Sequence, residues 1–78
     1  MNEDPATGLW TEEVTENFQS SPGQYDSRTF WIAYRSHVAS YGHTSDRISH
    51  AYGRGATEAE AIAAAIERYP YVAGKENP

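Results

Sequence analysis

The sequence predicts a small α+β domain in which one C-terminal helix packs on one face of a three-stranded antiparallel sheet, in the order β-β-β-α. Two observations lead to this prediction: three segments rich in β-branched and aromatic residues come first, and one capped, alanine-rich segment follows them. Consecutive strands usually pair, and an amphipathic helix needs an apolar sheet face to cover. We expect residues 1–8 to be a flexible N-terminus, residues 9–73 to form the single domain, and residues 74–78 to be a frayed tail.

The first two strands are predicted to form a hairpin. Residues 9–18 are rich in β-branched and aromatic side chains and favour a strand, although the adjacent Glu12 and Glu13 would also fit a short helix. Pro22 and Gly23 suit the two central positions of a type II turn. A second strand therefore follows and pairs with the first.

The second strand is predicted over residues 27–39, where successive side chains point to opposite faces of the sheet. The face that meets the helix would carry Phe30, Ile32, Tyr34 and Val38. The other face would stay open, or be covered by the N-terminal segment or the tail, and it would carry Trp31, Arg35 and His37. A polar loop then leads to a third strand over Arg47–Tyr52.

The helix is predicted to begin at Thr57 and to end before Pro70. The Thr57 hydroxyl can accept the N–H of Glu60, and the Glu60 carboxylate can accept the N–H of Thr57, which is a capping box. The alanines that follow favour a helix and would let it approach the sheet closely, with Gly53 and Gly55 serving the turn before it. The buried stripe is predicted at helical spacing to be Ala59, Ile62, Ile66 and Tyr69.

Composition places limits on the class of protein. With 78 residues and no cysteine, the chain can bury only a small core and has no disulfide or thiolate metal site to support it. The N-terminus is acidic and lacks the apolar run of a secretory signal, and no segment approaches the ~18 apolar residues of a membrane span. We expect a soluble, cytoplasmic protein that does not bind membranes and is a monomer or a weak homodimer.

The distribution of charge is uneven. The net charge is −5, and the first 27 residues contain six acidic residues and no basic one. The overall field repels nucleic-acid phosphates, so the expected partner is a basic protein rather than a nucleic acid. The alternative is that the acidic residues only keep a small domain soluble.

No pattern of residues predicts catalysis, a metal or a cofactor. Gly53–Gly55 before a helix resembles a fragment of a phosphate loop but lacks the Lys-Ser/Thr pair of that motif. Serines and Asp46 allow a Ser-His-Asp triad to be drawn, but no nucleophile elbow is present. The adjacent Glu12 and Glu13 would lie on opposite faces of a strand. The sequence contains three histidines, His37, His43 and His50, and their spacing matches no compact metal-ligand motif.

One segment carries a resemblance to known proteins. Residues 53–66 combine a glycine turn, Thr57, a glutamate-alanine pair and an apolar helix, and they resemble the strand-turn-helix unit of HicB-type antitoxins and of small phage-encoded proteins, including anti-CRISPR proteins. The Pro-Asp-Leu-Pro-Gly-like segment and the DNA-binding extension of HicB-type antitoxins are absent. The resemblance implies a phage-encoded inhibitor, acting in the bacterial cytoplasm, that occupies a nucleic-acid-binding surface of a CRISPR effector complex.

Together these features predict a non-enzymatic inhibitor that docks on a basic protein and blocks the binding of target DNA. Its carboxylates would face arginines and lysines of the partner, and Trp31 would be an apolar anchor. The expected partner-binding residues are Glu12, Glu13, Glu16, Asp26, Trp31, Arg35 and His37. The alternative is an antitoxin-like or single-strand nucleic-acid-binding domain that uses the open sheet face through Trp31, Arg35, His37 and Arg47.

Overall fold

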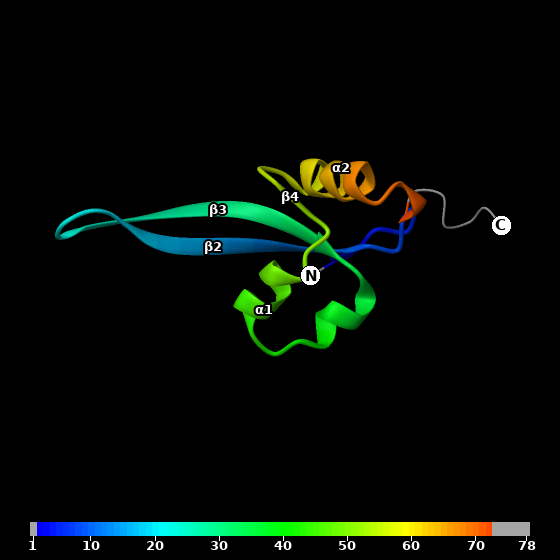
Figure 1. Ribbon diagram of the computed structural model, residues 1–78, viewed down its shortest axis with the longest axis horizontal. Helices are drawn as coiled ribbons and strands as arrows, with labels where there is room; N and C mark the ends of the chain where they lie inside the picture. The colour runs from blue at the N-terminus through cyan, green and yellow to red at the C-terminus, as the bar shows by residue number, and fades with distance from the viewer. Residues whose placement is uncertain (1, 73–78) are drawn as a thin grey trace.

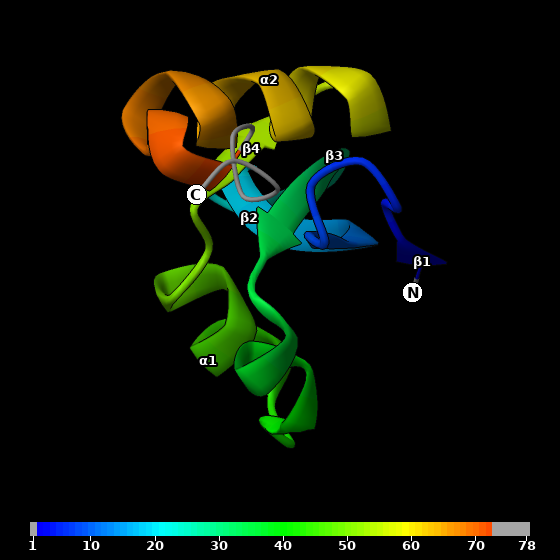
Figure 2. The same ribbon diagram turned by 90° about the vertical axis from the view of Figure 1, so that its right-hand side faces the viewer.

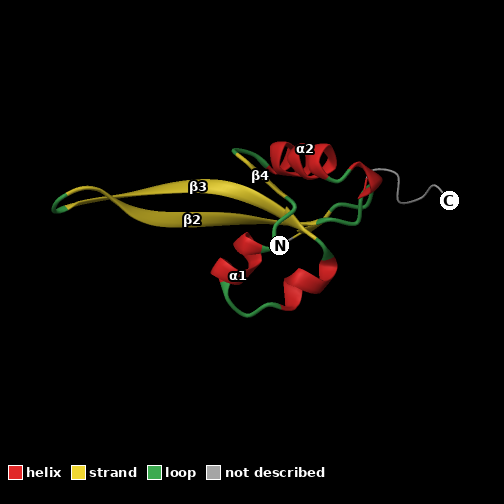
Figure 3. Ribbon diagram, viewed as in Figure 1, coloured by secondary structure: helices red, strands yellow, loops and turns green. Residues whose placement is uncertain are grey.

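A computed structural model, which describes residues 2–72, shows a four-stranded antiparallel sheet between two helical layers (Figures 1 and 3). The strands, in the order β1-β2-β3-β4, are β1 (Asn2–Glu3), β2 (Trp10–Ser21), β3 (Gln24–Tyr34) and β4 (Gly53–Gly55). The helices are α1 (Thr44–Ser49) and α2 (Glu58–Arg68), with two 3-10 helices, η1 (Ser36–Ser40) and η2 (Pro70–Val72). The predicted α+β class, with consecutive antiparallel strands and a C-terminal helix on one sheet face, is confirmed. The predicted frayed tail lies outside the described residues.

The hairpin of β2 and β3 is the longest feature of the molecule. Ser21 pairs with Gln24, and the turn between them contains Pro22 and Gly23, as predicted. Gly23 has φ of +78°, which fits the third position of a type II turn. The end of the hairpin that carries the turn projects well beyond both helices, which gives the molecule extents of 54 × 23 × 17 Å (Figure 1).

Helix α2 lies against β4 and the base of β3 (Figure 2). As predicted, Thr57 caps it: the Thr57 hydroxyl accepts the N–H of Glu60 at 3.2 Å. The return bond differs, because the Glu60 carboxylate accepts the N–H of Ala56 rather than that of Thr57. The helix ends at Arg68, two residues before Pro70.

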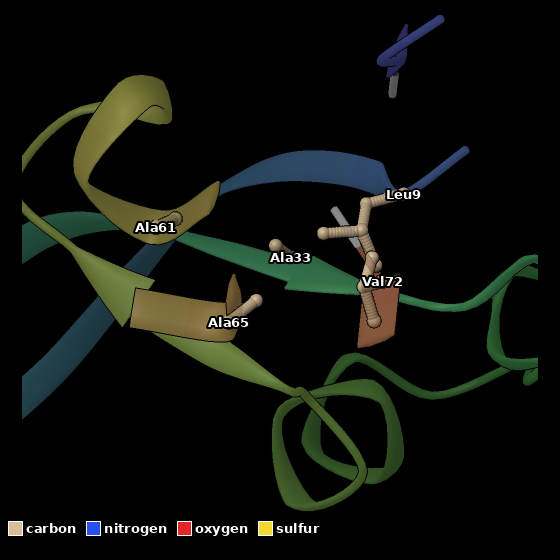
Figure 4. Packing of buried hydrophobic residues seen from close by; sticks show 5 residues of the cluster. All are labelled: Leu9, Ala33, Ala61, Ala65 and Val72. Atoms are coloured by element: carbon tan, nitrogen blue, oxygen red, sulfur yellow. The ribbon is translucent and has the colours of Figure 1, made fainter. Parts of the chain in front are cut away.

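The buried face of α2 is not the predicted stripe. Its fully buried residues are Ala61 and Ala65, while Ala59 is exposed and Ile62 and Ile66 are only half-buried. The reason is the close approach of α2 to β4, which small residues alone permit. A Cβ atom on Gly53 would lie 2.6 Å from the carbonyl oxygen of Ala61 and would also collide with the backbone nitrogen of Ala65. The two glycines of β4 therefore serve this contact and not a turn, and the cluster beneath α2 is completed by Leu9, Ala33 and Val72 (Figure 4).

The opposite sheet face is covered at its base by α1 and η1 (Figure 2). Phe30, Ile32 and Tyr34 share one face, as predicted, but β3 ends at Tyr34 and not at Ala39, and Val38 packs on this face from η1. These residues pack with Ile48 and Ala51 and not with the C-terminal helix. The predicted third strand, Arg47–Tyr52, is wrong: its first residues belong to α1, and a three-residue strand, β4, follows at Gly53. The bulky residues of β3 need a layer that leaves room for them, and α1 provides it.

Regular structure begins at Asn2 rather than near Leu9. The short strand β1 pairs with the start of β2. In the turn that follows, the hydroxyl of Thr7 donates a hydrogen bond to the carboxylate of Asp4 at 2.6 Å. Thr7 and Leu9 are both buried. The N-terminal segment thus covers the edge of the sheet beside the first residues of β2.

The contact between β4 and α2 leads to a stability prediction. Gly53→Ala should lower the free energy of unfolding by roughly 2–3 kcal/mol, because the added methyl group forces α2 away from the sheet. Gly42→Ala is the matched control, since a Cβ atom there meets nothing within 4 Å. Urea denaturation followed by circular dichroism measures both variants. Equal stability of the two variants would show that the close approach does not constrain the fold.

Candidate protein-binding surface

The predicted site residues do not form one surface. Side chains of β2 and β3 alternate, so the strand pairing places Glu12, Glu16 and Asp26 on the face of α1, and Glu13 and Trp31 on the face of α2. Arg35 and His37 are exposed but lie beyond the end of β3, with His37 in η1. Only Glu13 and Trp31 are direct cross-strand neighbours.

Glu12 is an internal residue of the fold. Its carboxylate accepts two hydrogen bonds from Arg47, at 2.8 Å from Nε and 3.0 Å from Nη2, and a third from the hydroxyl of Tyr34 at 3.0 Å. Arg47 also donates to the carbonyl oxygen of Tyr41 at 2.6 Å. The side chains of Arg47 and Glu12 are only 12% and 16% exposed. This network fastens α1 to β2, so Glu12 is not free to face a partner.

The same network changes the ionisation of its members. The hydrogen bonds from Arg47 hold the pKa of Glu12 below its usual value, despite partial burial. Burial and the nearby Glu12 carboxylate raise the pKa of the Tyr34 hydroxyl to about 12. At neutral pH the network therefore contains a carboxylate, a guanidinium and a neutral phenol, whose charges and hydrogen bonds are matched.

Glu16 and Asp26 lie on the projecting part of the hairpin. Glu16 pairs with Arg28 at 2.7 Å, but Arg28 is 62% exposed, so this ion pair contributes little stability. Asp26 accepts a hydrogen bond from the backbone N–H of Ser27 at 2.9 Å. These two carboxylates are solvated, but they point to the sheet face opposite Trp31.

The strongest candidate surface surrounds Trp31. This half-buried side chain packs against the core beneath α2, with Glu13 opposite it on β2 and Gly55 opposite it on β4. Glu60 lies directly against Gly55. Glu58 accepts a hydrogen bond at 2.5 Å from Thr11, which precedes Glu13 on the same strand face. We call Glu13, Trp31, Glu58 and Glu60 the acidic tryptophan surface.

Sequence reasoning missed two members of this surface. In the sequence, Glu60 is part of the capping box, and Glu58 is a residue of the first helical turn, where a carboxylate favours the helix dipole. The first turn of α2 also lies over the strands that carry Glu13 and Trp31. A carboxylate cluster could be inferred only once the helix was placed on the face of Trp31.

The residues of the nucleic-acid alternative do not come together. Trp31 lies on the face of α2, Arg47 is bound to Glu12 on the other face, and Arg35 and His37 follow the end of β3. Arg54 points to the face of α1, where its guanidinium carbon lies 4.1 Å from the ring centre of Phe30. The arginines thus form no continuous basic band with the tryptophan.

Two histidines lie near Tyr41 rather than around a metal. His37 and His50 make edge contacts with the Tyr41 ring, with ring centres 6.4 Å and 5.0 Å apart. A ring nitrogen of His50 lies 2.9 Å from the carbonyl oxygen of Asp46. Over residues 2–72, no group of three or more metal-ligating side chains is close enough to hold an ion. Among these residues, none of the helices has the length and apolarity needed to cross a bilayer.

The Glu12 network predicts a pH-dependent loss of stability. Because the folded pKa of Glu12 is lowered, its contribution is complete above the unfolded pKa and is lost as the pH falls through the folded pKa. Glu12→Gln should therefore destabilise the protein at pH 7 by about 2 kcal/mol, and the difference from the wild type should shrink toward pH 3. Glu13→Gln, an exposed neighbour on the same strand, is the control and should change stability little at either pH. Denaturant unfolding at several pH values tests this, and a Glu12→Gln effect independent of pH would contradict the assignment.

No protein-family model matches the chain, and no curated protein and no solved structure matches it significantly. We infer function from the placement of charged and aromatic side chains.

Proposed function

We propose that this protein is a non-enzymatic inhibitor that docks through the acidic tryptophan surface on a basic, nucleic-acid-binding surface of a larger protein. The resemblance of residues 53–66 suggests a CRISPR effector complex as that protein, and a phage-infected bacterial cytoplasm as the place of action. In this proposal the inhibitor keeps target DNA from its binding site.

The observation that carries the proposal is the pairing of Glu13 with the half-buried Trp31, beside two glutamates in the first turn of α2. Glu58 contacts Thr11 on the strand of Glu13, and Glu60 lies against Gly55 on the strand that pairs with Trp31. Tryptophan is enriched among the residues that dominate binding energy, and a surrounding polar rim is typical of protein interfaces. Glu13, Glu58 and Glu60 supply negative charge at the base of the sheet, where a hydrogen bond from Thr11 to Glu58 joins α2 to β2. Such a surface complements clustered arginines and lysines, and its attraction to them is weakened by salt.

The state of the arginines favours a protein partner over a nucleic acid. Binding to phosphates requires free cations, and each phosphate contact adds to the salt dependence of binding. Here Arg47 is held by Glu12, and Arg54 lies over the ring of Phe30. The exposed Arg28 points to the sheet face opposite Trp31, and the exposed Arg35 lies beyond the end of β3. The net charge of the protein is −5, so it is negative like a nucleic acid, whereas proteins that bind nucleic acids usually carry positive charge.

A DNA-binding assay on purified CRISPR effector complexes of several types tests this proposal. The protein should reduce target-DNA binding by at least one complex, and Glu13→Lys should weaken this inhibition about tenfold because it places a cation against a basic partner. Glu67→Lys is the matched control, since it makes the same charge change at an exposed site in the last turn of α2. Circular dichroism of both variants verifies that they are folded.

Each other outcome removes a defined part of the proposal. Inhibition that is equally sensitive to Glu13→Lys and Glu67→Lys would leave only non-specific charge attraction. The absence of inhibition in every complex would remove the CRISPR effector as partner. A gel shift with short single strands at low salt would instead support the nucleic-acid alternative.

A further inference from the structure

The projecting part of the β2–β3 hairpin has two unpaired edges. Strand β1 pairs only with the first residues of β2, and β4 pairs only with residues 31–33 of β3. Between these limits, no strand or helix of residues 2–72 pairs with or covers the ribbon, which exposes two aromatic rings: Tyr25 is 77% exposed and Phe18 is 41% exposed. An isolated two-stranded ribbon is only marginally stable in water, and an unpaired edge is a template for another strand.

The edge of β3 presents outward-pointing backbone groups at known positions. The carbonyl oxygen of Ala33 accepts a hydrogen bond from the N–H of Tyr52, so the backbone groups of Ala33 point away from β2. These groups alternate in an antiparallel strand, and therefore those of Tyr25, Ser27 and Thr29 also point outward. The outward N–H of Ser27 is bonded to the Asp26 carboxylate, at 2.9 Å, and not to a strand.

We propose that two copies of this chain pair along the free edge of β3, antiparallel and about a two-fold axis at Ser27. The free edge runs from Gln24, next to the turn, to Phe30, next to the residues that pair with β4. Residues opposite each other across the two copies must point to the same sheet face, so they differ by an even number of positions. The two-fold axis therefore passes between two copies of the same residue. Ser27 is the midpoint of the free edge, and an axis there uses its whole length.

The charges of the edge are complementary to themselves about this midpoint. An axis at Ser27 places Arg28 of each copy opposite Asp26 of the second copy, and Tyr25 opposite Thr29. Opposite charges and aromatic–β-branched pairs are both favourable across strands. Glu16, which already pairs with Arg28 within each chain, flanks the guanidinium from the other side. In the dimer, the Asp26 carboxylate would bind the Arg28 guanidinium of the second copy in place of the N–H of Ser27. That N–H would then donate to the backbone carbonyl of Ser27 in the second copy.

The free edge of β2 does not offer the same match. An axis at Glu16 would place two glutamates directly opposite each other, which is destabilising. An axis at Asn17 would place Glu16 opposite Phe18 and would form no ion pair. Self-complementarity therefore selects the edge of β3 and a second copy of this chain over an unrelated strand.

The proposed pair uses the tip of the hairpin and leaves the acidic tryptophan surface at its base. It therefore does not rest on the proposed function. Pairing over this edge is a small interface, so the dimer should dissociate on dilution. Sedimentation equilibrium of the full chain should show a reversible monomer–dimer equilibrium, which Glu13→Lys leaves unchanged. A chain that stays monomeric at the highest soluble concentration would overturn the proposal.

A cysteine at the axis tests the register. Opposite residues of a hydrogen-bonded pair have Cα atoms about 5.5 Å apart, which suits a disulfide. The sequence contains no cysteine, so Ser27→Cys introduces a single thiol. Under oxidised glutathione this variant should form a covalent dimer. Asn17→Cys is the matched control, because Asn17 is exposed and pairs with Ser27 across the hairpin but lies on the edge of β2. Equal cross-linking of both variants would overturn the register.

Charge exchange supplies an independent test. Asp26→Lys alone and Arg28→Glu alone should each weaken association about tenfold, because each places like charges opposite one another. A mixture of the two variants should associate as strongly as the wild type, since both cross-strand pairs are again opposite in sign. If the mixture of the two variants does not associate as strongly as the wild type, the pairing is wrong. Hydrogen exchange gives a further check: protection of the Ser27 amide only when a different protein is added would also overturn the pairing.

Discussion

The close approach of α2 to β4 is the constraint on which the rest of the architecture depends. Gly53 and Gly55 bring the sheet backbone against the helix backbone, and Ala61 and Ala65 are the only helix residues that fit fully beneath it. This contact fixes the helix at one end of the sheet. An 11-residue helix is about 16 Å long, whereas the 12-residue strand β2 is about 40 Å long. Most of the hairpin must therefore extend beyond the helix.

Helix α1 is held on the sheet by a polar contact in addition to its apolar packing. Arg47 reaches Glu12 across 35 residues of sequence and binds it with two hydrogen bonds, while Tyr34 donates a third. Such a partly buried pair adds geometric specificity more than net stability, since both charges lose hydration. It determines where the short helix α1 sits, because a six-residue helix has little intrinsic stability of its own.

Local signals in the sequence were sufficient where local physics decides the structure. The Thr57 cap, the end of the helix before Pro70 and the turn at Pro22 and Gly23 depend on near neighbours, and each was predicted correctly. The alternation of β3 was correct as far as Tyr34, where the strand ends, but the helix was assigned to the wrong face. An alanine-rich helix that approaches glycines fits the face of Ala33, and the face of Ile32 and Tyr34 needs a more distant layer.

Non-local contacts explain the remaining differences. The segment Arg47–Tyr52 was expected to be a strand, but Arg47 is held by Glu12, and Ile48 packs with the bulky residues of β3. Neither contact leaves a periodic signal. The same holds for the candidate site. In the sequence Glu58 and Glu60 are only residues of the first helical turn, and the fold brings them against Thr11 and Gly55. Predicted site residues of the same charge, such as Glu12 and Glu13, point to opposite faces of the sheet.

The position of the two proposed surfaces has a further consequence. A two-fold axis that relates antiparallel strands of one continuous sheet is perpendicular to that sheet, so each face of one copy continues into the same face of the other. The acidic tryptophan surface belongs to the face of α2 and lies at the base of the hairpin, whereas the axis lies near its tip. In the pair, both copies of this surface would face the same way at opposite ends of the extended sheet. A broad basic partner could then bind both at once, and the second contact would form at a high effective concentration, which raises avidity without any new type of contact.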